Sequence, residues 1–311
     1  TDKERYFFEL GTYHADMHAE ALTYTRQTLG LQAPVLRVPK SSSKMLEPHA
    51  DYLPHDVFVP GGWFNLGARK DAPFVFDNEK WAHEVVIQPF EIAKAPVTNR
   101  EFQNFVDSGG YENATHWDLE GWAWCQETDS THPVYWQPHG PGNWLIRRFD
   151  KSLPLPLDEP IIHVNWHEAN AYCRWAGQRL PTEAEWEAAA LGEVGPDGTL
   201  APVKRRFPWG NTPPDPAQAN LDGRGWVLLM SQLFLPGTAL LAADRCSAMF
   251  GNGQPPVLPA TKAYHLILMP TIRRPGWMGN MPFCAAVPGP PAVALFGILS
   301  ATSILVTAGM C

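Results

Sequence analysis

The sequence lacks three features that identify common classes of protein. It has no C-x-x-C pair and only five scattered cysteines, at positions 125, 173, 246, 284 and 311. This number and spacing argue against a disulfide framework and a cysteine-based zinc site. Basic residues form no cluster and are outnumbered, 24 against 32 acidic residues, which gives a net charge of −8. We therefore expect no nucleic-acid partner.

The N-terminus has no apolar signal segment, because residues 2–5 are all charged. Together with the unpaired cysteines, this favours a reducing cytoplasm as the location of the protein. Thr1 is not an initiator methionine, and the residues after it have the pattern of the middle of a helix. We expect the sequence to be a fragment whose upstream part is missing.

Residues 4–29 have the periodicity of a single amphipathic helix. Its predicted stripe consists of Leu10, His14, Met17, Ala21 and Tyr24. Gly30 ends the helix, since glycine adopts the left-handed conformation of a helix C-terminus without strain. Residues 34–56 are rich in proline and serine and are predicted to be a linker.

A second domain is predicted from Val57 onward. Short β-like runs at 57–59, 63–66 and 84–87 alternate with turn signals, which is typical of strands in a loop-rich domain. Three helices are predicted to begin after capping residues, each of which has a glutamate three positions later, as in a capping box. These pairs are Thr98 with Glu101, Asn165 with Glu168, and Thr182 with Glu185.

Residues 160–190 closely resemble the central signature of the formylglycine-generating-enzyme-like family, which includes the iron-dependent sulfoxide synthases of ergothioneine and selenoneine synthesis. Asp77-Asn78-Glu79, Gly109-Gly110-Tyr111 and Pro208-Trp209-Gly210 follow the family order, so the resemblance covers residues 57–226. It implies an α+β fold. Residues 1–33 would be the last helix of a DinB-like helical bundle, and residues 57–226 a C-type-lectin-like, loop-rich catalytic domain.

The first helix contains the string His14-Ala15-Asp16-Met17-His18-Ala19-Glu20. Two histidines four positions apart face the same way and can bind one metal ion, although a bare pair of this kind is more often two ordinary histidines. In the ergothioneine and selenoneine synthases, such a helix carries two iron ligands. The resemblance thus implies Fe(II) bound by His14 and His18, with Glu20 orienting a ligand or remaining solvated. A third histidine would come from the missing upstream part.

Two further histidines, His163 and His167, are a rival metal pair with the same spacing. Because they lie inside the structural signature, we favour core or capping roles for them. Cys173 is predicted to be a buried apolar residue, and Cys125 has no neighbouring base in the sequence. The sequence assigns no catalytic or substrate-binding residue.

The resemblance implies an oxidoreductase that uses Fe(II) and O2 to join a thiol or selenol donor to the imidazole of trimethylhistidine (hercynine), in ergothioneine or selenoneine biosynthesis. Residues 17–21 favour the selenoneine branch. Two alternatives stay open. A formylglycine-generating oxidase would act on a protein cysteine and would build its metal site from C-terminal cysteines. A non-catalytic binding module of the same fold would need no metal.

Charge is nearly absent after Trp226, since the last 85 residues contain five charged side chains against 51 before them. Residues 291–311 have none, and about 20 apolar residues could span a bilayer. A shifted reading frame explains this better. With plausible codons, residues 248–254 and 284–292 regroup to Asn-Val-Trp-Glu-Trp-Thr and Leu-Arg-Gly-Gly-Ser-Trp-Ala-Thr-Arg, two signatures of the family. We predict an out-of-frame tail at 227–311, an inactive chain lacking half its active site, and no membrane span in the intact protein.

Overall fold

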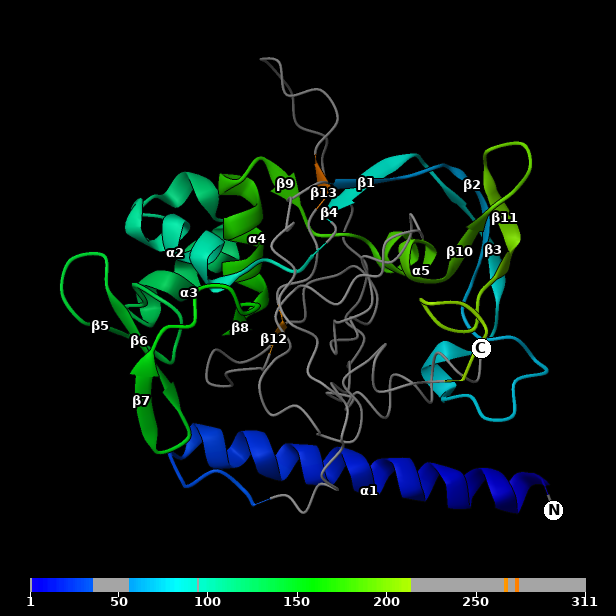
Figure 1. Cartoon of the computed structure of the whole chain (residues 1–311), viewed down its shortest axis with the longest axis horizontal. Helices are drawn as coiled ribbons and strands as arrows, with labels where there is room; N and C mark the ends of the chain where they lie inside the picture. Colours follow the sequence, from blue (N-terminus) through cyan, green and yellow to red (C-terminus); the bar gives the residue numbers. More distant parts are fainter. Residues whose placement is uncertain (1, 36–55, 94, 214–265, 268–271, 274–311) are drawn as a thin grey trace.

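The computed structural model describes residues 2–35, 56–93, 95–213, 266–267 and 272–273. Most of the predicted linker and nearly all of the predicted out-of-frame tail lie outside these residues. The described chain forms two lobes, with one long helix running along the same side of both (Figure 1). This mixed helix and sheet architecture confirms the expected α+β class, whereas the likeness to a DinB bundle stays a prediction.

The long helix is α1, which spans Asp2–Thr28 and matches the predicted helix 4–29. Its 27 residues give a length of about 40 Å at 1.5 Å per residue. Gly30, at a φ of +64°, ends the helix as predicted. The amide of Gly30 donates to the carbonyl of Gln27, and that of Leu31 donates to Arg26, which is the hydrogen-bond pattern of a Schellman motif.

The first lobe contains two small sheets and one helix. In one sheet, β1 (Asp56–Val59) pairs with β4 (Phe90–Ala93), and β13 (Ile272–Arg273) joins β4 to β9 (Gln178–Arg179). The other sheet has the order β10 (Gly192–Val194), β11 (Leu200–Lys204), β2 (Gly62–Leu66) and β3 (His83–Ile87). Helix α5 (Glu183–Leu191) packs against β2 and β3. The short 3-10 helix η1 (Asp77–Glu79) precedes β3.

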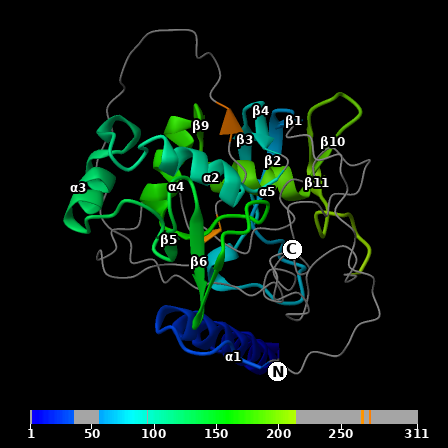
Figure 2. The ribbon, with the colours of Figure 1, turned by 60° about the vertical axis from the view of Figure 1, so that its left-hand side comes forward.

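The second lobe surrounds an aromatic core. Its elements are α2 (Asn99–Asp107), η2 (Ala114–His116), α3 (Leu119–Glu127), β5 (Trp136–Pro138), β6 (Trp144–Arg148), β7 (Lys151–Pro154), β8 (Ile162–Val164) and α4 (Trp166–Trp175). Phe102 stacks on Tyr172 in the centre of this core, with ring centroids 5.4 Å apart. Strands β5, β6 and β7 form an antiparallel sheet whose β6–β7 hairpin extends toward α1 (Figures 1 and 2).

All three predicted capping boxes are confirmed. In α2, α4 and α5 the capping side chain accepts from the third amide of the helix, and the glutamate at that position accepts from the amide of the capping residue. These contacts span three residues, so local sequence determines them. The strands predicted at 57–59, 63–66 and 84–87 are confirmed as β1, β2 and β3.

Four residues of the predicted out-of-frame tail are described. Leu266 and Ile267 form β12, which pairs antiparallel with β8, and Ile272 lies opposite both Ile92 and Arg179. The frame shift itself stays a prediction for the nucleotide sequence to test. Of the helices in the described ranges, none combines the length and the apolar character that crossing a membrane requires.

Candidate functional site

His14 and His18 lie one turn apart on α1, and both side chains are exposed. Their Nε2 atoms are 2.9 Å apart, and the two rings meet edge to face with centroids at 4.4 Å. One neutral imidazole can therefore donate an N–H to the other. The predicted helical stripe included His14, but the structure places this side chain outside the contact between α1 and the lobes.

The N-terminal half of α1 rests on the first lobe. The ring of Tyr6 stacks on Phe74 at 5.2 Å, and its hydroxyl donates to Asp77 Oδ1 at 3.1 Å. Tyr13 meets Phe74 edge to face at 4.8 Å. The ammonium of Lys80 lies 4.7 Å above the Tyr6 ring and also pairs with Asp77. This end of the helix is thus held by aromatic packing around one ion pair.

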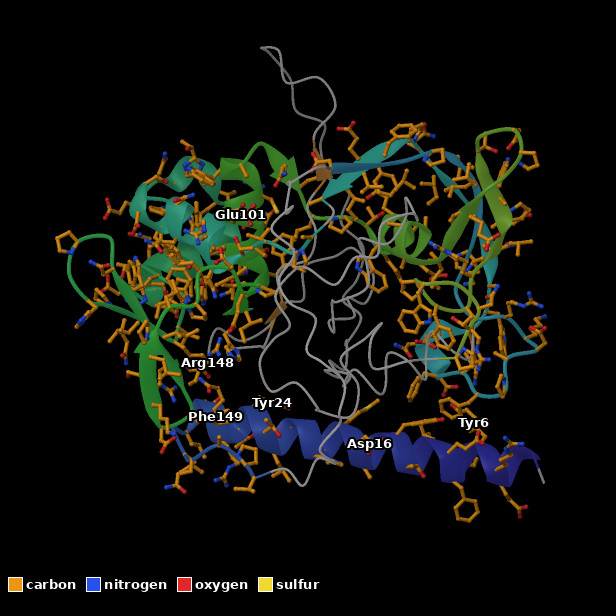
Figure 3. All side chains as sticks on the ribbon, in the orientation of Figure 1. Tyr6, Asp16, Tyr24, Glu101, Arg148 and Phe149 are labelled. Atoms are coloured by element: carbon orange, nitrogen blue, oxygen red, sulfur yellow. The ribbon has the colours of Figure 1, made fainter. Side chains whose placement is uncertain are left out.

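The C-terminal end of α1 rests on the β6–β7 hairpin of the second lobe. The side-chain amide of Gln27 donates to the carbonyl of Arg147 at 2.9 Å, and its oxygen accepts from the amide of Phe149 at 2.6 Å. In return, the Arg147 guanidinium donates to the carbonyl of Gln27 at 2.6 Å. Figure 3 shows Phe149 beside this end of α1 and Tyr6 near the other.

These two contacts determine the direction in which the histidine pair faces. At about 100° per residue, Tyr13 and Gln27 lie within roughly 60° of Tyr6 around the helix, whereas His14 and His18 lie roughly 80° and 120° from it on the other side. The imidazoles therefore face sideways, away from the line of contact with the lobes. Their exposure follows directly from this geometry.

The distance between the two Nε2 atoms is compatible with two ligands of one metal ion. Two imidazole nitrogens that each lie about 2.1 Å from a metal ion, with a right angle between the two metal–nitrogen bonds, are about 3 Å apart. The observed distance between the two Nε2 atoms is 2.9 Å. Neutral imidazole is a suitable ligand for iron, copper or zinc. Within the described part of the chain, however, no group of three or more histidine, cysteine, aspartate or glutamate side chains could hold a metal ion. The side chain of Glu20 is not among those that the structure describes.

The rival pair, His163 and His167, is split between two elements. His163 is on β8 at a φ of +64°, with its ring 4.8 Å from that of Tyr135. His167 is on α4, and its Nδ1 lies 3.6 Å from Asp118 Oδ1, the carboxylate that caps α3. Each ring thus contacts a different partner in the second lobe. This arrangement agrees with the packing roles that we favoured for them.

Two carboxyl groups have strongly raised pKa values: Glu168 is buried in the second lobe, and Glu79 is half-buried in η1, next to the Asp77–Lys80 pair that contacts α1. Glu168 caps α4 from inside the core, accepting from the amide of Asn165 at 2.7 Å and from the Tyr111 hydroxyl at 2.5 Å. Burial raises the pKa of Glu168 to about 7. Burial, followed by repulsion from Glu187, raises the pKa of Glu79 to about 7 as well, and Lys204 partly opposes this. Both groups can hold a proton near neutral pH.

The two described cysteines are buried in the second lobe. Cys125 Sγ donates to the carbonyl of Ser130 at 3.3 Å, and burial raises the pKa of its thiol to about 11. A thiol with such a pKa is a poor nucleophile and a poor metal ligand at neutral pH. Cys173 is fully buried, which confirms its predicted apolar role.

Sequence reasoning missed the residues that hold the C-terminal end of α1. Gln27 is only 5% exposed, which is unusual for a glutamine near the end of a surface helix. Its partners Arg147 and Phe149 lie about 120 residues away in the sequence. The positive φ of Phe149, +54°, is a feature that only the structure reveals. No local pattern connects these positions.

Comparisons with known proteins match about half of this chain or more. Residues 42–232, more than half of the chain, match the sulfatase-modifying factor enzyme 1-like domain. The chain is 45% identical to the hercynine oxygenase of Mycolicibacterium smegmatis over 168 residues, which are 54% of this chain and 37% of that protein. It is 41% identical to the hercynine oxygenase of Mycobacterium tuberculosis over 162 residues, 52% of this chain and 36% of that protein.

The formylglycine-generating enzyme of Thermomonospora curvata is 35% identical over 175 residues, 50% of this chain and 52% of that protein. Among solved structures, PvdO from Pseudomonas aeruginosa matches 50% of this chain at 21% identity, with a TM-score of 0.27. The chain spans about a third of the length of the hercynine oxygenases that it matches. On the match over residues 42–232, the chain belongs to the family of the sulfatase-modifying factor enzyme 1-like domain.

Proposed function

We propose that this chain is part of an oxygen-dependent enzyme that joins a thiol or selenol donor to the imidazole of hercynine, as in ergothioneine or selenoneine synthesis. The observation that carries the proposal is that the sequence identity to hercynine oxygenases is higher than the identity to formylglycine-generating enzymes. Hercynine oxygenases are 41–45% identical to the chain, and formylglycine-generating enzymes 34–36%. The exposed histidine pair on α1 supports the same activity.

In this proposal, His14 and His18 hold Fe(II) through their Nε2 atoms. Bound iron would supply a site at which the donor sulfur or selenium and O2 can react. The two side chains would bind as neutral imidazoles, and a third protein ligand and the substrates would complete the site. Two anchors, at Tyr6 and at Gln27, hold the helix that carries them.

A formylglycine-generating oxidase is the alternative function, because enzymes with that name are also related to the chain. That activity would build its metal site from C-terminal cysteines and would need no histidine pair. Cys246, Cys284 and Cys311 lie outside the described residues. The two described cysteines are buried, and Cys125 has a raised pKa, so neither of these two supports the alternative. A non-catalytic module is the third possibility, since an inactive C-alpha-formylglycine-generating enzyme 2 from Mus musculus is 37% identical over 179 residues.

The test is metal binding and turnover in the full-length protein, with the reading frame established from its gene. We expect the parent protein to bind one equivalent of Fe(II) and to consume O2 when hercynine and a thiol or selenol donor are both present. We expect the double variant His14→Ala, His18→Ala to lose iron and activity together. Iron content measured by mass spectrometry and product measured by chromatography provide the two readouts.

His116→Ala is a matched control, because His116 is a half-buried histidine of the second lobe outside the proposed site. This variant should retain iron and turnover. If the protein lacking both imidazoles of α1 retains its iron and its turnover, the proposed function is wrong. Activity on a peptide cysteine without hercynine would support the formylglycine-generating alternative instead.

A further inference from the structure

We propose that Gln27 is a positioning residue: its contact with the β6–β7 hairpin fixes the rotation of α1 about its axis and thereby the placement of the metal-binding imidazoles. This inference rests on the proposed function of His14 and His18. It assigns a role to a residue nine positions away from the nearer histidine. The argument uses the reciprocal hydrogen bonds at this contact, the packing beneath it and the geometry of the helix.

The contact at Gln27 is reciprocal. The Gln27 side chain satisfies both a carbonyl and an amide of the hairpin, at Arg147 and Phe149. The Arg147 guanidinium donates to the carbonyls of Gln27 and Thr28 in the last turn of the helix, and the Gln27 carbonyl also accepts from the amide of Gly30. The positive charge of Arg147 beside the C-terminus of α1 also interacts favourably with the helix dipole. A sliding or rotating helix would break all of these bonds at once.

The hairpin side of the contact is itself supported from below. The Arg147 guanidinium lies 4.6 Å above the ring of Tyr135, and the Tyr135 hydroxyl is 3.1 Å from Thr28 Oγ1. Tyr135 is buried and contacts His163 on β8. The contact is thus built on the core of the second lobe and does not depend on a free loop.

The backbone conformation of the hairpin is unusual at its contact with Gln27. Phe149 adopts a φ of +54°, which a bulky residue rarely does, and it is in this conformation that its amide reaches Gln27 Oε1 at 2.6 Å. On the helix side, a Cβ added at Gly30 would lie 3.3 Å from Arg147 Nη1. Both chains therefore approach closely at this point.

Small rotations of α1 matter because the imidazoles are far from its axis. A side chain at about 6 Å from the axis moves by about 2 Å when the helix turns by 20°. Such a turn moves both imidazoles together, so it changes their distances to the third protein ligand and the substrates, and metal ligands must lie within about 0.2 Å of their ideal distances. Tyr6 and Tyr13 restrain the other end through aromatic contacts with Phe74 and one hydrogen bond from Tyr6 to Asp77. At the C-terminal end, the single side-chain amide of Gln27 makes two hydrogen bonds to the hairpin backbone.

The test compares Gln27→Ala and Gln27→Glu with the parent in the full-length protein, using Co(II) as a spectroscopic probe of the histidine site. We expect Gln27→Ala to weaken Co(II) binding by roughly tenfold, the scale of losses seen for residues that orient metal ligands. Amide hydrogen exchange in residues 14–24 should accelerate by about the same factor, while the melting temperature stays near that of the parent. Gln27→Glu should be intermediate, because a carboxylate still accepts from Phe149 but cannot donate to Arg147.

Gln103→Ala is the matched control, since the amide of Gln103 also donates to a backbone carbonyl of the second lobe, that of Gly142 in the β5–β6 turn at 2.9 Å. It should leave Co(II) binding unchanged. Should Gln27→Ala fail to fold, Gln27→Glu carries the test. Parent-like Co(II) affinity and exchange in a folded Gln27 variant would overturn the inference. If His14→Ala, His18→Ala leaves Co(II) binding unchanged, the proposed function fails, while the exchange data still decide whether Gln27 holds α1.

Discussion

The buried carboxyl group of Glu168 should make the stability of this protein fall as the pH rises from 5 to 8. Glu168 is only 4% exposed, and burial raises its pKa from the ordinary 4.5 to about 7, although hydrogen bonds from Tyr111 and the Asn165 amide oppose this. Between these values the folded protein retains a proton that the unfolded chain releases. The folded state therefore binds more protons, and the free energy of unfolding decreases with pH across this window.

The size of the effect follows from the two pKa values. A rise from 4.5 to about 7 corresponds to about 3 kcal/mol, of which about 2 to 3 kcal/mol appears between pH 5 and pH 8. Glu168→Gln removes the ionisation and retains the shape of the side chain. Its amide oxygen can still accept from Asn165, so the α4 cap is preserved.

Urea unfolding at pH 5, 6, 7 and 8 measures this directly. We expect the free energy of unfolding of Glu168→Gln to depend less on pH than that of the parent, by about 2 to 3 kcal/mol over the range. Glu79 contributes a similar slope to both proteins, so it cancels in the comparison. Glu101→Gln is the control, because Glu101 has the same capping role in α2 but is only half-buried. Parallel pH profiles for the parent and Glu168→Gln would refute the reasoning.

Two further predictions concern stability. Burial acts to raise the pKa of Glu185, but hydrogen bonds from the Arg179 guanidinium at 2.5 Å and from Thr182 together outweigh it and hold this pKa below its usual value of 4.5. Glu185→Gln should therefore destabilise the protein at pH 7, and the difference should shrink in thermal melts as the pH falls below 4.5. Gly110→Ala should lower the free energy of unfolding by about 3 kcal/mol in urea titrations, because its Cβ would lie 2.2 Å from the buried ring of Phe105. A Cβ added at Gly11 in α1 would meet nothing within 4 Å, so Gly11→Ala should instead raise the free energy of unfolding by about 1 kcal/mol. Equal changes in the free energy of unfolding for the two glycine variants would contradict this account.

Sequence alone predicted the elements whose contacts are local. Helices α2, α4 and α5 begin where their capping residues predict, because each capping box joins residues three positions apart. The end of α1 at Gly30 follows from the same kind of local preference. The spacing of His14 and His18 likewise guarantees that their rings meet on one face of a helix.

Tertiary structure decided which face of α1 contacts the rest of the protein. Four residues of the stripe predicted from periodicity are half-buried, namely Leu10, Met17, Ala21 and Tyr24, whereas His14 is exposed. Tyr6, Tyr13 and Gln27, which were not in that stripe, make the anchoring contacts. Periodicity identifies a face by its apolar residues, whereas this helix is anchored largely by hydrogen bonds and aromatic rings.

The partners of those anchors are distant in sequence. Phe74 is 68 residues beyond Tyr6, and Phe149 is 122 residues beyond Gln27. Such pairs form because the two lobes, each built around its own core, present complementary groups along one side (Figure 1). The sequence by itself thus determined a helix with two adjacent imidazoles and three capped helices after it. Only the tertiary structure decided how that helix is held and where its imidazoles face, because the hydrogen bonds that hold it join residues that no local pattern connects.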